Sequence, residues 1–146
     1  MVGVEINMVV KDSLAAYELY RRIFDIELVE KSDFPVGSNE VVFTLYGVRF
    51  HMLDENPDYH LFAPKADQSQ SIWYNVLVED INETFSKALG SGCQVIQEVT
   101  TMEAMGVSNA VFRDPFGFVW LLHQIHRVVS HEERIKHFQD QLEDVK

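Results

Sequence analysis

The chain has 146 residues, 47% of them hydrophobic, and carries a formal net charge of −11 from 12 basic and 23 acidic side chains. That length suits one domain with a substantial core. The acidic balance argues against a nucleic-acid partner, because phosphate binding requires clustered basic residues that displace counterions.

The first half of the chain predicts a strand, a helix and three further strands. Alternating β-branched residues mark the first strand, and Asp12 or Ser13 can cap the helix that follows. Pro35 and Gly37 indicate a loop before the last two strands, which form a hairpin turning at Tyr46-Gly47. The predicted bounds are 4–10 for the first strand, 13–24 for the helix, and 27–31, 40–45 and 48–53 for the remaining strands.

The second half predicts the same order of elements. Gly90 and Gly92 suit the end of its helix. The predicted bounds are 72–78 for the first strand, 81–89 for the helix, 94–98 for the next strand, a loop to 107, and 109–113 and 117–124 for the last strands. A final helix over 130–143 is expected from the capping box of Ser130 and Glu133, and we expect it to pack on the domain or on a partner subunit.

The two halves match at fixed offsets. Asp80 follows Asp12 by 68 residues, and the same offset places Asn75 on Asn7. Gly117 follows Gly47 by 70 residues. Such self-similarity indicates two copies of one supersecondary unit within one domain. The fold class is therefore α+β, with module one over 1–54, a connector over 55–71 and module two over 72–126. The space between the copies is the natural place for a site.

Strand alternation separates two faces of the expected sheets. One face is apolar at every position, so the helices should cover it. Its residues are Ile6, Met8, Val10, Val48, Phe50, Met52, Tyr74, Val76, Val78, Phe118, Trp120 and Leu122. The other face mixes charge, amide, imidazole and indole, which describes a ligand cleft better than a core. The alternative is a face that is simply wetted by solvent, as in many antiparallel sheets.

Three segments carry a family resemblance: Ala110 to Trp120, which contains Asp-Pro-Phe-Gly, the paired βαβββ order, and Leu53-Asp54-Glu55-Asn56-Pro57. In these the chain resembles the vicinal oxygen chelate superfamily, the glyoxalase/bleomycin-resistance/dioxygenase fold, and most closely its PhnB-like branch. The resemblance covers residues 1 to about 126. It implies two tandem βαβββ modules whose curved mixed sheets surround a cleft, commonly completed by dimerisation, so a homodimer is expected.

Metalloenzymes of this superfamily carry ligands on the first and last strands of each module. The resemblance places those positions at Glu5, His51, Trp73 and Leu121. Indole and isobutyl groups cannot coordinate a divalent ion. His123, two residues beyond Leu121, could complete a three-ligand site with Glu5 and His51. A metal-free pocket is nevertheless the main expectation, and no cofactor is expected.

Several side chains have more than one interpretation. Glu5 and Arg49 could form a cross-strand charge pair or could grip a polar ligand. His51 could act as a general base or simply be hydrogen-bonded. Cys93 is interpreted as a packing residue, and as the single cysteine it excludes an internal disulfide and fits a reducing compartment.

The loop 100–106 carries Met102 and Met105, which suggest an adaptable apolar wall or lid. The histidines outside the expected strands are predicted to face solvent: His60, His126, His131 and His137. There is no glycine-rich phosphate loop and no Gly-x-Ser-x-Gly elbow.

The expected function is metal-independent binding of a small amphipathic organic ligand, as a sequestering, sensing or antibiotic-resistance protein. The alternative is a metal-dependent lyase, isomerase or dioxygenase. No run reaches the ~18 apolar residues that span a bilayer, and the N-terminus does not resemble a signal peptide, so no membrane partner and a cytoplasmic location are expected. The candidate ligand-binding residues are Glu5, Asn7, Arg49, His51, Trp73, Asn75, Leu121 and His123.

Overall fold

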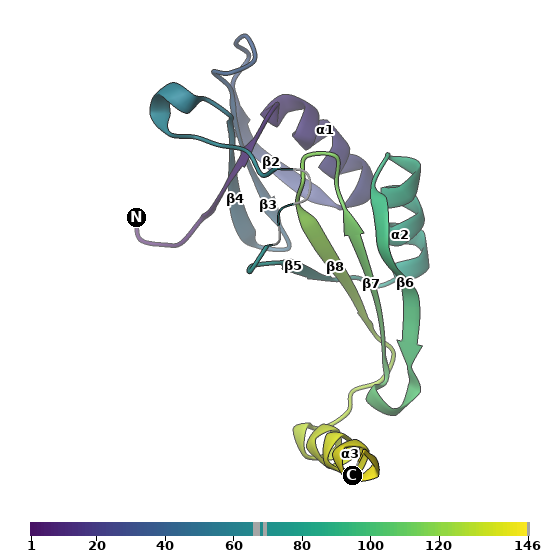
Figure 1. Cartoon of the computed structure of the whole chain (residues 1–146). Coiled ribbons are helices and arrows are strands. Elements are labelled where there is room, and N and C mark those ends of the chain that lie inside the picture. Colours follow the sequence, from purple (N-terminus) through teal and green to yellow (C-terminus); the bar gives the residue numbers. More distant parts are fainter. Residues whose placement is uncertain (66–67, 69, 146) are drawn as a thin grey trace.

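The computed structural model describes residues 1–65, 68 and 70–145, which form two four-stranded mixed sheets with one helix packed on each (Figure 1). Sheet one has the order β1 (Ile6–Val10), β4 (Val48–Asp54), β3 (Glu40–Leu45) and β2 (Ile26–Lys31). Sheet two has the order β5 (Tyr74–Leu77), β8 (Val119–Ile125), β7 (Val107–Arg113) and β6 (Gln94–Met102). The helices are α1 (Ser13–Ile23), α2 (Ile81–Gly90) and α3 (His131–Asp144), with short 3-10 turns η1 (Pro57–Tyr59) and η2 (Glu103–Met105).

The register of the strands confirms the internal repeat. β1 runs parallel to β4 with Asn7 opposite His51, and β5 runs parallel to β8 with Asn75 opposite Leu121. The offsets of 68 and 70 residues found in the sequence therefore connect equivalent positions in space. The α+β class and the paired βαβββ modules are confirmed.

The two modules also start their helices in the same way. Asp12 accepts a hydrogen bond from the amide of Ala15 at 3.1 Å, and Asp80 accepts one from Glu83 at 3.1 Å. A side chain at the end of the last strand satisfies a further amide of each helix: Ser13 N donates to Asp54 at 2.7 Å, and Ile81 N donates to Gln124 at 2.9 Å. These first-turn amides have no partner inside a helix, so the capping groups fix where each helix begins.

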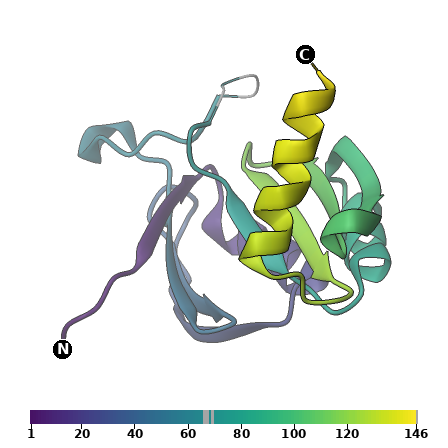
Figure 2. The same ribbon diagram turned by 90° about the horizontal axis from the view of Figure 1, so that it is seen from below.

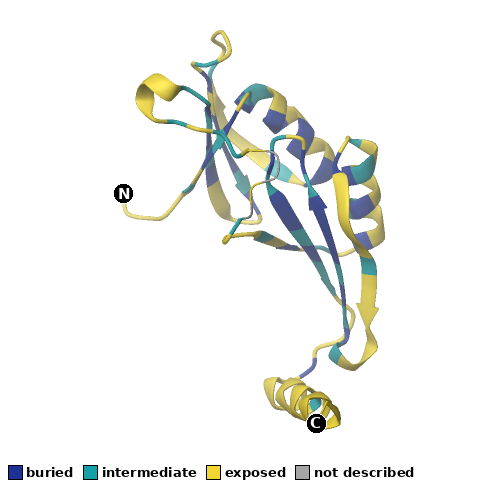
Figure 3. Cartoon of the chain, in the orientation of Figure 1, coloured by how far each residue is buried: buried dark blue, intermediate teal, exposed yellow. Residues whose placement is uncertain are grey.

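The core lies between the sheets and the two neighbouring helices α1 and α2 (Figures 1 and 3). Trp120 is its centre, with ring-centroid distances of 5.2 Å to Tyr20, 5.1 Å to Phe24 and 4.9 Å to Tyr74. The face predicted to be covered is largely buried, as expected. Val48 is the exception at 47% exposed, because it directly follows the Tyr46-Gly47 turn at the start of β4.

Several strand bounds differ from the predicted ones by one or two residues, and the largest difference is at the end of β6. β6 continues to Met102 instead of ending at Glu98, because Thr100, Thr101 and Met102 pair with β7 opposite Asn109, Ser108 and Val107. Their β-branched threonines suit a strand once a partner is present. The loop predicted from 99 to 107 shrinks to η2 and Gly106. The Tyr46-Gly47 hairpin turn is confirmed, with positive φ of 47° and 85° at its two residues.

The third helix stands apart. Ser130 caps it by accepting a hydrogen bond from Glu133 N at 3.1 Å, as its sequence predicts. α3 lies beyond the ends of β7 and β8, away from α1 and α2 (Figures 1 and 2). None of its described side chains is fully buried. Within the described residues, no helix has the length and apolar character needed to traverse a membrane.

Candidate functional site

Three of the candidate ligand residues form a charged cluster on the outer face of sheet one. Glu5 lies just before β1 and accepts a hydrogen bond from Arg49 Nε at 2.8 Å. His51 places Nδ1 3.1 Å from Glu5 Oε1 and Nε2 3.1 Å from Glu40 Oε2. Hydrogen bonds from Arg49 and from His51 lower the pKa of Glu5. The charge-pair interpretation of Glu5 and Arg49 is therefore confirmed, and His51 is held between two carboxylates.

The equivalent positions in module two carry different chemistry. Trp73 precedes β5 and is 54% exposed, and its indole N–H donates to the carbonyl of Gln70 at 3.1 Å. Leu121 is half-buried on β8. In the described part of the chain, no three His, Cys, Asp or Glu side chains are grouped to hold an ion. Because Glu5 is committed to Arg49 and the module-two positions offer no donor atoms, this set does not fit a divalent metal.

Other candidates line two separate hollows. Trp73 and Asn75 lie with Tyr46 and Val48 around a cleft of about 370 Å³ between the two sheets. Asn7 lies in a wider groove of about 860 Å³ beside the connector residue Phe62. The structure thus brings Trp73 and Asn75 together, places Asn7 elsewhere, and leaves Glu5, Arg49 and His51 as a cluster of their own.

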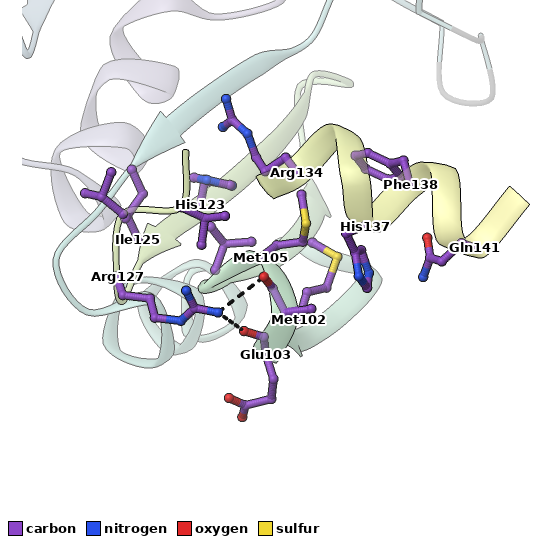
Figure 4. A pocket seen from close by; sticks show the side chains of 14 residues that line it. Met102, Glu103, Met105, His123, Ile125, Arg127, Arg134, His137, Phe138 and Gln141 are labelled. Carbon is purple, nitrogen blue, oxygen red and sulfur yellow. Dashed lines mark hydrogen bonds between the residues drawn. The ribbon is translucent and has the colours of Figure 1, made fainter. Parts of the chain in front are cut away.

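His123 lies in a third hollow, a pocket of about 500 Å³ between the end of sheet two, η2 and α3, which we call the α3 pocket (Figure 4). Its apolar walls include Met102 at the end of β6, Met105 in η2 and Phe138 from α3. The prediction that the two methionines form an apolar wall is confirmed. The polar side chains at the α3 pocket are His123, Arg127, Arg134, His137, Gln141 and Glu103.

Hydrogen bonds to backbone carbonyls hold the floor of this pocket in place. Arg127 Nη2 donates to the carbonyls of Glu103 at 3.0 Å and Ala104 at 3.3 Å. Gly106 has a positive φ of 67°, and its carbonyl accepts hydrogen bonds from the amides of His126 and Arg127. A Cβ at Gly106 would stand 2.6 Å from the Arg127 carbonyl oxygen, so only glycine allows this close approach. On β8, His123 Nδ1 lies 2.5 Å from Asn109 Oδ1, which orients the ring.

Sequence reasoning missed most of the α3 pocket. Arg127 and Arg134 carry no local pattern that would mark them as pocket residues, and Phe138 belongs to a helix that was expected only to pack on the domain or on a partner subunit. His137 was predicted to face solvent, which is wrong: it is half-buried and lines the pocket. His126 is exposed as expected, although its Nε2 lies 2.7 Å from Ser108 Oγ. One signal was available, since Arg134, His137, Phe138 and Gln141 follow helical spacing.

The buried cysteine has no role in these hollows. Cys93 is 8% exposed, and burial raises the pKa of its thiol to about 12. The thiolate required for nucleophilic chemistry is therefore not formed near neutral pH. The packing interpretation of Cys93 is confirmed.

Comparison with known proteins gives a family match. The family model described as Glyoxalase/Bleomycin resistance protein/Dioxygenase superfamily matches residues 4–122. No curated protein matches the chain. Among solved structures, the genomically encoded fosfomycin resistance protein FosX from Listeria monocytogenes has a TM-score of 0.65 at 16% identity, covering 92% of this chain and 98% of its own.

Two other solved structures have the same fold. TioX from Micromonospora sp. ML1 has a TM-score of 0.61 at 16% identity, covering 88% of this chain and 100% of its own. The PhnB protein from Bacillus cereus has a TM-score of 0.61 at 16% identity, covering 84% of this chain and 99% of its own. At such identities the likeness concerns the fold alone.

Proposed function

This chain belongs to the glyoxalase/bleomycin resistance protein/dioxygenase superfamily, and we propose that within it the protein binds a small organic ligand without a metal ion. The observation that carries the proposal is the α3 pocket. Its volume of about 500 Å³ falls in the range of ligand sites, and it combines thioether and aromatic walls with a few polar side chains. A sequestering protein and a sensor would both use such a site.

The donor chemistry of the sheet faces supports metal independence. Two of the four positions at which family metalloenzymes carry ligands hold Trp73 and Leu121, and a third, Glu5, is hydrogen-bonded to Arg49. Glu5 and His51 are the only oxygen or nitrogen donors at these four positions, and two donors from one chain would hold a divalent ion weakly. For the same reason the metal-dependent lyase, isomerase or dioxygenase is the less favoured function. Within the superfamily we propose the PhnB-like branch, supported by the Asp114-Pro115-Phe116-Gly117 segment and the fold shared with the PhnB protein.

Metal analysis combined with probe binding tests this proposal. The purified protein is supplemented with manganese, nickel, zinc and iron, desalted and analysed for bound metal. Binding of the neutral fluorescent probe N-phenylnaphthylamine is then measured with and without a chelator. We expect less than stoichiometric metal and an unchanged probe affinity. A stoichiometric transition metal that is lost in His51→Ala would overturn the proposal in favour of the metal-dependent enzyme.

We also propose that the ligand-binding form is a homodimer that uses α3. Ile135, Phe138 and Leu142 of α3 are 42%, 51% and 68% exposed, and Val145, the residue that caps its C-terminus, is 85% exposed. Their spacings of three, four and three residues match the a and d positions of a coiled-coil seam. The flanking Gln139 and Gln141 are neutral, so two copies can approach along this seam although each chain carries a net charge of −11. Such a seam fits a second copy of the same helix.

A further inference from the structure

We propose that the ligand of the α3 pocket is an organic anion with an apolar body, and that Arg134 selects it. This inference rests on the proposed function and adds the chemical class of the ligand. Acidic residues outnumber basic ones by 23 to 12 in the whole chain, yet the residues lining this pocket include two arginines, two histidines and a single carboxylate, Glu103.

The single carboxylate does not neutralise the pocket. The Glu103 side chain is exposed and points away from the other lining side chains (Figure 4). Its contact with Arg127 runs through its backbone carbonyl and not through its carboxylate. Carbonyl oxygens orient the guanidinium of Arg127 without cancelling its charge. The positive charge of Arg127 therefore remains available to the pocket.

Arg134 is the more available of the two arginines. It lines the pocket from the first turns of α3, and its guanidinium extends at the edge of the pocket, on the opposite side from Glu103 (Figure 4). Within residues 1–65, 68 and 70–145, no carboxylate lies within ion-pair distance of Arg134 or Arg127. An arginine without a carboxylate partner beside an apolar wall is suited to bind a carboxylate, sulfonate or phosphoryl group.

The apolar walls define the rest of the ligand. Met102, Met105 and Phe138 present polarizable, adaptable surface, which suits an aromatic or branched aliphatic body. His123, oriented by Asn109, adds one directional contact at the sheet side of the pocket. The ligand class is thus a molecule with one anionic group and an apolar body, small enough for about 500 Å³.

Two probes with nearly the same aromatic frame test the inference. Anilinonaphthalene sulfonate carries the anion, whereas N-phenylnaphthylamine lacks it. Both are titrated into the full chain, into Arg134→Gln and into Lys136→Gln. The Lys136 variant removes the same charge from the same helix, but Lys136 does not line the pocket. We expect Arg134→Gln to weaken binding of the sulfonate about tenfold, since that corresponds to one charge-assisted hydrogen bond. Lys136→Gln should change it by less than about twofold.

The neutral probe distinguishes a failure of anion selection from a failure of the pocket itself. Its affinity should be the same in Arg134→Gln as in the unaltered chain, and both probes should weaken in Met105→Glu, which places a carboxylate in the apolar wall. Equal loss of sulfonate binding in the Arg134 and Lys136 variants would overturn anion selection and leave the pocket intact. Failure of Met105→Glu to affect either probe would overturn the pocket itself, and with it the proposed function.

Discussion

The hydroxyl of Tyr20 on α1 donates a hydrogen bond to Asp114, a buried residue directly after β7, at 2.5 Å. The same carboxylate accepts the Trp120 indole N–H at 2.8 Å and the amides of Phe116 and Phe118. Burial raises the pKa of Asp114, and the hydrogen bonds from Tyr20 and Trp120 act in the opposite direction. One carboxylate thus joins the helix of module one to the hairpin turn of module two.

Tyr20→Phe should destabilise the protein by about 1.5–3 kcal/mol, because it removes a hydrogen bond to a buried charged group. Urea denaturation at neutral pH measures the loss. Tyr17→Phe is the matched control, since it deletes a hydroxyl from the same helix without touching Asp114. It should lower the free energy of unfolding clearly less than Tyr20→Phe does.

The loss in Tyr20→Phe should also depend on pH. A raised carboxyl pKa means that the native state binds the proton more tightly than the unfolded state does. This group therefore favours folding below its ordinary value of 3.8 and costs stability as pH rises through its raised value. The Tyr20 hydrogen bond offsets that cost in the ionised form. The difference between Tyr20→Phe and the unaltered chain should grow as pH rises through this window, and a constant difference would contradict the assignment.

Asp54 should behave in the opposite way. Burial raises its pKa, but hydrogen bonds from Ser13, Asn39 and Gly37 outweigh it and lower the pKa overall. The stability that Asp54 contributes is present above 3.8 and is lost as pH falls through its lowered value. Asp54→Asn leaves backbone donors facing an amide NH₂, at a cost of about 1–3 kcal/mol for each unsatisfied donor.

Denaturation at a series of acidic pH values tests this expectation. The variant should show a flatter pH profile than the unaltered chain below pH 3.8. Asp12→Asn is the control, because asparagine caps a helix about as well as aspartate does. If Asp54→Asn and Asp12→Asn lower the free energy of unfolding by the same amount, Asp54 does not anchor the start of α1.

Gly106→Ala should loosen the floor of the α3 pocket. Its added Cβ would meet the Arg127 backbone at 2.6 Å, whereas a Cβ at Gly37, which also has a positive φ, meets nothing within 4 Å. Gly37→Ala therefore reports the backbone penalty alone, about 1 kcal/mol. We expect Gly106→Ala to lose more stability and to weaken N-phenylnaphthylamine binding, while Gly37→Ala keeps full binding. Equal probe affinity in both variants would show that the pocket does not depend on Gly106.

Leu142→Glu should shift the proposed homodimer toward monomer, because it buries a charge in the seam of α3. Lys136→Glu introduces the same side chain outside the seam and should leave the dimer intact. Sedimentation equilibrium of the two variants and of the unaltered chain measures the effect. A single species with the mass of one chain, already in the unaltered protein, would remove the basis of the proposal.

Much of the fold follows from local patterns in the sequence. Alternating residues indicated the strands. The starts of the helices were indicated by their capping residues, Asp12, Asp80 and Ser130. The two offsets indicated the repeat. Each of these signals acts within a few residues or through direct duplication, so it survives in the linear chain. β6 was too short in the prediction, because Thr100 to Met102 become strand only through pairing with β7.

The candidate site could likewise be predicted only in part. Alternation alone was enough to place Glu5, Arg49 and His51 on one face, because neighbouring strands share a pleat. Whether those side chains would meet Trp73 or His123 depends on how two sheets and a third helix pack, and no spacing in the sequence records that. The structure gathered Met102, Arg127 and Arg134 from three separate segments around one hollow. The sequence by itself determined the duplicated modules and their faces, whereas the long-range packing of α3 against the end of sheet two decided where a ligand can bind.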